Sequence, residues 1–192
     1  MGQIDAVTVR EDGVMTADVS HIGGVLSGSF DPLHEGHEGL AKAAAEMLDA
    51  EVVFELAVAN VDKSPLEETA IRERLAQFEG RNTVVVTKQP RFDGKAALLP
   101  GCTFVIGWDT AARLFVPRYY GDDEGRMLAA MSDVRDRGCA FLVAGRVVDG
   151  EFRSLHDLQV PEGFSDILTA IPESVFRQDL SSTELRQASG GA

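Results

Sequence analysis

The chain has 192 residues, 44% of them hydrophobic and 26% charged, a balance typical of one globular domain. Its formal charge of −13 excludes proteins that wrap onto nucleic acid or bind anionic membrane surfaces, because both depend on clustered basic side chains. No apolar run approaches the roughly 20 residues that span a bilayer. Asp5, Glu11, Asp12 and Asp18 interrupt any signal-peptide-like stretch. We therefore expect a cytoplasmic protein with neither a nucleic-acid nor a membrane partner.

The first twenty residues are predicted to form an amino-terminal extension, separate from a domain over residues 21–192. Two β-prone runs, 6–10 and 14–19, flank a Glu-Asp-Gly turn, which is typical of a hairpin. This extension would either add an edge to the sheet or provide a contact between the copies of a homo-oligomer.

Strand-like and helix-like segments then alternate, which predicts an α/β fold with a doubly wound, mainly parallel sheet of five to six strands. Strands are expected at residues 22–27, 52–59, 83–87, 103–107, 139–144 and 167–171. Helical spacing of apolar residues is found around 40–48, 67–78, 111–115 and 124–135, and a last helix is expected from residue 181. A second hairpin is expected around residues 147–152.

A first group of candidate ligand-binding residues connects the first long strand to the first helix. In a parallel sheet, ligands bind where such loops leave the carboxyl ends of the strands, and a helix start favours phosphate. Two histidines three residues apart could both donate hydrogen bonds to the charge that develops during phosphoryl chemistry. The segment reads Gly-Ser-Phe-Asp-Pro-Leu-His-Glu-Gly-His, and its candidates are Gly28, Ser29, Phe30, Asp31, His34, Gly36 and His37.

A second group opens the last helix. Ser181 and Glu184 have the spacing of a capping box, which would fix the helix start. Ser182 and Thr183 offer hydroxyl and amide donors there, and Arg186, one turn along, could reach the same anion with its forked guanidinium.

Together these two segments resemble the signatures of the nucleotidylyltransferase superfamily, G-x-F-D-P-x-H-x-G-H and I-S-S-T-x-I-R, in the same order along the chain. Residues 28–37 are most similar to those of the bacterial nicotinate or nicotinamide mononucleotide adenylyltransferases. The resemblance covers roughly residues 22–188 and implies a Rossmann-like fold in a single domain. Leucine replaces the isoleucine of the second signature at positions 180 and 185.

The resemblance also suggests where the acceptor binds. Lys63, in the loop after the second long strand, matches a basic residue that relatives place against phosphate, with Arg72 or Arg74 as its partner on the next helix. Trp108 and Asp109 stand at the family's G-x-D element near the acceptor. Relatives usually have a small residue at position 108, so the tryptophan would either stack on a base or a pyridine ring or fill the pocket that the usual acceptor occupies.

The reaction that the resemblance implies is transfer of AMP from ATP to a small phosphorylated acceptor, with pyrophosphate as the leaving group. His34 and His37 would hold the α- and β-phosphates, and Ser182, Thr183 and Arg186 the β- and γ-phosphates. Mg²⁺ would arrive bound to the ATP phosphates, since no carboxylate cluster in the sequence offers a metal site of the protein's own. Two alternatives stay open: cytidylyl transfer to another phosphorylated acceptor, and a nucleotide-binding sensor or assembly module without turnover.

Overall fold

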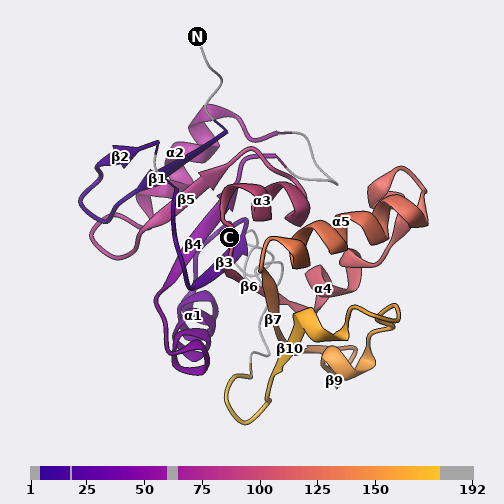
Figure 1. Cartoon of the computed structure of the whole chain (residues 1–192). Helices are drawn as coiled ribbons and strands as arrows, with labels where there is room; N and C mark the ends of the chain where they lie inside the picture. Colours follow the sequence, from indigo (N-terminus) through magenta and orange to yellow (C-terminus); the bar gives the residue numbers. More distant parts are fainter. Residues whose placement is uncertain (1–4, 18, 60–64, 178–192) are drawn as a thin grey trace.

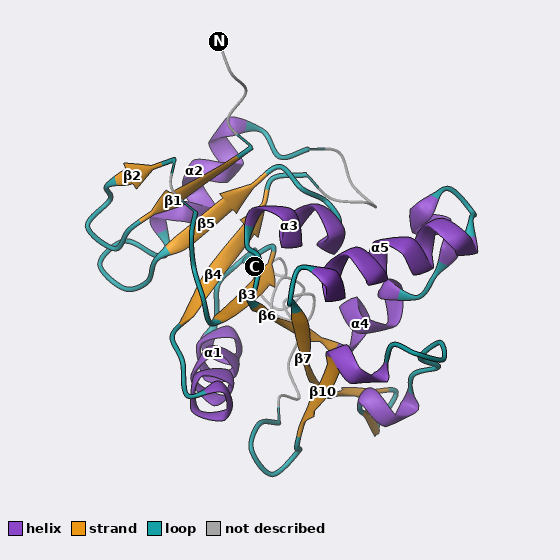
Figure 2. Ribbon diagram, viewed as in Figure 1, coloured by secondary structure: helices purple, strands orange, loops and turns teal. Residues whose placement is uncertain are grey.

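Strands and helices alternate through residues 5–17, 19–59 and 65–177, the parts that the computed structural model describes (Figure 2). The α-helices are α1 (Glu35–Leu48), α2 (Glu68–Ala76), α3 (Phe92–Leu98), α4 (Trp108–Leu114) and α5 (Glu124–Asp136). The strands are β1 (Ala6–Val9), β2 (Met15–Thr16), β3 (Gly24–Gly28), β4 (Val52–Ala57), β5 (Val84–Thr87), β6 (Thr103–Gly107), β7 (Ala140–Ala144), β8 (Arg146–Val148), β9 (Glu151–Arg153) and β10 (Leu168–Ile171). Short 3-10 turns lie at η1 (Pro117–Tyr120), η2 (Leu155–Asp157) and η3 (Ser165–Ile167).

The central sheet has the doubly wound order that the alternation predicts. Its eight strands lie in the order β10-β7-β6-β3-β4-β5-β1-β2, and every pair from β10 to β5 is parallel (Figure 1). The chain starts this parallel part at β3, runs outward through β4 and β5, and returns to β6 on the other side of β3. Ligands bind at such a reversal point, outside the carboxyl ends of the strands.

The sheet is wider than the predicted five to six strands because the amino-terminal hairpin joins it. β1 pairs antiparallel with β5, from Ala6 opposite Thr87 to Val9 opposite Val84, and β2 pairs antiparallel with β1. The amino-terminal extension therefore forms an added edge of the sheet, the first of the two alternatives expected for it. The later hairpin, β8 with β9, forms a separate two-stranded sheet.

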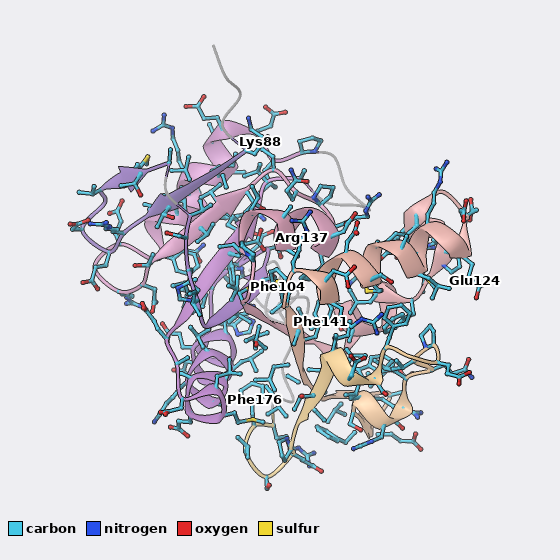
Figure 3. All side chains as sticks on the ribbon, viewed as in Figure 1. Lys88, Phe104, Glu124, Arg137, Phe141 and Phe176 are labelled. Atoms are coloured by element: carbon cyan, nitrogen blue, oxygen red, sulfur yellow. The ribbon has the colours of Figure 1, made fainter. Side chains whose placement is uncertain are left out.

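Apolar side chains cover both faces of the sheet, because successive residues of a strand point to opposite sides. On one face, Phe104 and Phe141 pack beneath residues of α3, α4 and α5. On the other, Phe54 and Leu142 pack with residues of α1 and α2. Figure 3 shows Phe104 and Phe141 inside the molecule, and Figure 1 shows the helix layers on either side. This double cover confirms the α/β fold class.

Several element ends differ from the predicted ones. The first parallel strand begins at Gly24 rather than residue 22, because Gly23 has φ +144° and a Cβ there would lie 2.5 Å from the carbonyl oxygen of Glu51. Helix α1 starts at Glu35, one residue before Gly36, near which the sequence predicts the helix start, whereas α3 was not predicted. The helix expected from residue 181 lies outside the described residues. Within the described parts, no helix is both long and apolar enough to cross a membrane.

Candidate active site

The loop after β3 is folded around the buried side chain of Phe30. Its ring is fully buried and packs edge-on against Phe54 and Phe78, at centroid distances of 5.5 and 5.2 Å, and against His37 at 5.1 Å. The ring leaves no room above Gly28, where a Cβ would meet it at 2.8 Å. Phe30 therefore belongs to the core, and any contact it makes with a nucleotide would be through its backbone.

Helix α2 holds the same loop from the side. Arg74 donates to the carbonyl of Ser29 at 2.9 Å and to the carboxylate of Asp31 at 3.1 Å, and Gln77 donates to the carbonyl between them at 3.0 Å. The side chain of Arg74 is only 15% exposed. Arg72, in contrast, is 76% exposed and pairs with Glu68 on its own helix. Either Arg72 or Arg74 was expected as the phosphate-binding partner of Lys63. Of the two, Arg74 is the one that contacts the loop after β3 and lines the cavity beside it.

His34 and His37 stand together at the start of α1. His34 is the residue that precedes the first turn, and its backbone N–H donates to Nδ1 of His37 at 3.3 Å. The two rings stack with centroids 3.8 Å apart and an interplanar angle of 29°. Because Nδ1 of His37 accepts a hydrogen bond, the neutral ring carries its proton on Nε2. His37 can therefore donate from Nε2 to a ligand at the helix start.

Both histidines are held in the neutral form near pH 7. Burial, and secondarily the neighbouring charge of His34, lowers the pKa of His37 to about 4. Burial also lowers the pKa of His34. An anion bound against the rings would oppose this effect, because an adjacent negative charge favours the protonated form. The pair is thus suited to bind and partly neutralise phosphate without a charge of its own beforehand.

A cavity of about 370 Å³ opens beside this loop, at the reversal point of the sheet. Its walls come from the carboxyl ends of β3 and β4, from α3 with the residues before it, and from α4 and η1. Four basic side chains contribute to the lining although the chain as a whole is strongly acidic: Arg74, Arg91, Lys95 and Arg113. Three aromatic residues, Phe92, Tyr119 and Tyr120, line it as well. The cavity is therefore suited to an anionic acceptor with an apolar or aromatic part.

Arg91 and Tyr120 form one wall of the cavity. The guanidinium of Arg91 binds both carboxylate oxygens of Asp93, at 3.1 and 2.8 Å, and lies 5.5 Å from the centre of the Tyr120 ring. The Tyr120 hydroxyl donates to the carbonyl of Leu114 at 3.0 Å. Burial, followed by the charge of Asp93, raises the pKa of Tyr120 to about 12, so this phenol stays protonated and serves the architecture of the wall.

The G-x-D element after β6 lies partly away from the cavity. Asp109 forms an ion pair with Arg146, at the start of β8, and neither Trp108 nor Asp109 is among the described residues that line the cavity. The indole Nε1 of Trp108 is buried and has no hydrogen-bond partner within the described parts of the chain. Two other residues of α4, Thr110 and Arg113, do line the cavity.

The remaining candidates, Lys63, Ser182, Thr183 and Arg186, lie outside the described residues. The described residues end at 177. Near this end, the ring of Phe176 packs against α1, 3.3 Å from the position that a Cβ of Gly39 would take (Figure 3). Over the described residues, no three His, Cys, Asp or Glu side chains are grouped so as to hold a metal ion.

Sequence reasoning missed the α3 side of the site, which contributes Arg91, Phe92 and Lys95. A signal was present, since Phe92, Ala96 and Leu99 are spaced for one face of a helix, with Lys95 on the same face.

A family model described as cytidylyltransferase-like matches residues 25–188. No curated protein matches the sequence. Among solved structures, the chain is similar to the nicotinic acid mononucleotide adenylyltransferase of Plasmodium falciparum complexed with NaAD, with 18% sequence identity and a TM-score of 0.47. That similarity covers 87% of this chain and 83% of the other.

Proposed function

We propose that the chain, which belongs to the cytidylyltransferase-like family of nucleotidyltransferases, transfers AMP from ATP to a small phosphorylated acceptor. The choice of AMP follows from residues 28–37, which resemble those of adenylyltransferases. An oxygen of the acceptor phosphate attacks the α-phosphorus of ATP. The new P–O bond forms while the bond to pyrophosphate breaks, and pyrophosphate leaves with the electron pair. Catalysis rests on positioning and on neutralising charge, without a covalent intermediate on the protein.

The observation that carries this proposal is the neutral His34–His37 pair at the start of α1. The preceding loop residues Ser29 and Asp31 line the cavity, although the two histidines themselves do not. The Nε2–H of His37 is available because Nδ1 already accepts the His34 amide. A donor fixed in this way can strengthen its bond as negative charge grows on a phosphate in the transition state. The free amides at the helix start attract the same phosphates.

The cavity supports a phosphorylated acceptor. Arg74, on α2, and Arg91, just before α3, both line it, as do the aromatic rings of Phe92 and Tyr120. A cavity of about 370 Å³ is within the range that small ligands occupy. Nicotinate and nicotinamide mononucleotide, which combine a phosphate with an aromatic ring, are the first acceptors to test.

The binding site for the triphosphate and the acceptor would be completed by residues outside the described parts of the chain. Ser182, Thr183 and Arg186 are proposed to bind the β- and γ-phosphates, and Lys63 the acceptor. Phe176 contacts Gly39, which lies on α1 two residues after His37. Because Ser182 follows Phe176 by only six residues, the chain is long enough for the Ser182 group and the histidine pair to bind the same triphosphate. Mg²⁺ would be held by the phosphates and would supply further neutralisation of their charge.

The test is release of pyrophosphate by the purified full chain with Mg²⁺ and either ATP or CTP. The acceptors are both pyridine mononucleotides, glycerol 3-phosphate and 3-phosphoglycerate. Turnover with ATP and at least one acceptor supports the proposal, and turnover with CTP alone supports the cytidylyl alternative. Nucleotide binding without pyrophosphate release from any pair would indicate the sensor or assembly module.

A further inference from the structure

A buried ion pair lies behind one wall of the cavity and reaches its lining through Lys95. Lys95, on α3, donates from Nζ to Oε2 of Glu55, on β4, at 2.7 Å, and the Lys95 and Glu55 side chains are 6% and 0% exposed. Thr87, on β5, donates to the other carboxylate oxygen at 2.5 Å. Glu55 thus has both oxygens occupied, while Lys95 is part of the cavity lining.

Stability alone does not account for this pair. Removing two charges from water costs about as much as their attraction returns, so apolar residues of similar size often serve equally well. The ammonium group has three N–H donors, and Glu55 is the hydrogen-bond partner that the described structure gives it. A second face of the group lies against the Phe92 ring, with Nζ 4.7 Å from the ring centre. Hydrogen-bonding capacity therefore remains toward the cavity.

The Ser27 hydroxyl, next to this pair, is also unsatisfied. Ser27 lies opposite Glu55 in the β3–β4 register, so both side chains are on the same face of the sheet. Its Oγ is buried without a hydrogen-bond partner in the described parts of the chain, and the residue lines the cavity. Buried hydroxyls are normally paired, so an unpaired one beside a cavity indicates a bound polar group.

Charge is distributed unevenly with depth. Arg91 and Arg113 are exposed at the rim, whereas Lys95 is buried and neutralised by Glu55. A phosphate could reach the exposed guanidinium groups of Arg91, which also binds Asp93, and of Arg113. A carboxylate bound beside Lys95 would meet an ion pair whose charges cancel, so it would lose its hydration without the attraction of a net positive charge. An uncharged polar group has much less hydration to lose.

We propose that Lys95 and Ser27 select the acceptor by binding an uncharged hydrogen-bonding group, such as a carboxamide or hydroxyl, at the end opposite its phosphate. Glu55 sets this preference by neutralising Lys95. This inference rests on the proposed function, because it assigns the far end of the acceptor in the same cavity.

The test measures binding of two matched pairs of probes to the full chain by calorimetry. Nicotinamide mononucleotide is compared with nicotinate mononucleotide, and glycerol 3-phosphate with 3-phosphoglycerate. In whichever pair binds, the wild type should favour the uncharged member by about tenfold or more. Glu55→Gln leaves the charge of Lys95 uncompensated and should move that preference toward the carboxylate by a similar factor. Lys95→Met with Glu55→Gln, which leaves no buried charge, should abolish it.

Outcomes separate the two proposals. A folded Glu55→Gln protein with unchanged preference overturns the inference, as does a wild type that favours the carboxylates. ATP binding with no binding of either uncharged probe also overturns it, while leaving nucleotide chemistry intact. Failure of both ATP and CTP to bind would instead remove the proposed function. If Glu55→Gln does not fold, the double variant alone decides: retention of the wild-type preference contradicts the selection by Lys95.

Discussion

The backbone amide of His34 donates to Nδ1 of His37 at 3.3 Å, which fixes the proton of the neutral His37 ring on Nε2. This single hydrogen bond turns a residue that could either donate or accept into a directed donor at the start of α1. It also allows the donor and the acceptor of that ring to be tested separately.

His37→Asn should keep an acceptor near Nδ1, since the Asn Oδ1 can take its place, but it lacks the Nε2 donor. We expect pyrophosphate release to fall roughly a hundredfold or more, the effect of losing one donor to transition-state charge. Melting temperature should change little. His156→Ala, at an exposed histidine in η2, is the control and should retain full activity. An active His37→Asn enzyme would contradict the assigned role.

Acidification should destabilise the protein through His37. Its pKa is about 4 in the folded chain and 6.5 as the ordinary value, so the unfolded state binds the proton first as pH falls. The stability that neutral His37 contributes is complete above pH 6.5 and is lost by about pH 4. The loss amounts to roughly 2–3 kcal/mol. Urea titrations at several pH values should show that wild type loses this much more than His37→Asn. Parallel curves for the two proteins would speak against it.

Arg74→Ala should loosen the loop after β3, because the guanidinium bonds to Ser29 and Asp31 are lost together. We expect a loss of about 1–2 kcal/mol in the free energy of unfolding and a raised KM for ATP. Arg72→Ala, two residues earlier on the same helix, removes only an exposed pair with Glu68 and should cost less than about 0.5 kcal/mol. Equal effects of the two substitutions would show that the loop contacts are unimportant.

Gly28→Ala should displace the Phe30 ring, which lies 2.8 Å from the new methyl group. Overpacking of this kind costs about 1–3 kcal/mol. Combining it with Phe30→Leu should cost less than the sum of the two single substitutions, because the leucine leaves room for the methyl group. Chemical denaturation of the three variants gives the coupling. Additive costs would mean that the ring and the glycine do not constrain each other.

Arg186→Ala should weaken ATP binding by roughly ten- to a hundredfold, as expected for a lost charge-assisted bond to phosphate. Arg186→Lys should restore part of the affinity, because it keeps the charge without the forked geometry. Arg177→Ala, which removes a surface pair with Glu173, is the matched control and should bind ATP normally. Titration of ATP into the three proteins decides the question, and a silent Arg186→Ala would leave the histidine loop as the remaining support from the motifs.

The histidine side of the site was predictable because its residues are contiguous. Gly28 to His37 form one loop and one helix start, so local sequence specifies their arrangement. The doubly wound, mainly parallel sheet followed from the alternation of strands and helices, and the structure confirms it.

The α3 side was not predicted, for physical reasons. The helix has seven residues, follows Pro90, and contains Gly94, so its propensity is weak and its apolar pattern short. Lys95 occupies a buried position only because Glu55, forty residues earlier, neutralises it. The ion pair between Asp109 and Arg146 could not be predicted for the same reason, since Arg146 lies 37 residues further along the chain. Long-range charge pairs of this kind leave no periodic signal.

The antiparallel joining of β1 to β5 sets an order of assembly during synthesis. Residues 6–9 leave the ribosome well before residues 84–87, with which they pair. Until β5 has emerged and docked on β4, β1 has no partner but β2, and a two-stranded ribbon is marginally stable at best. The β1–β5 pairing can therefore form only after residue 87 has been synthesised, at a stage when β6, β7 and β10 have not yet been synthesised.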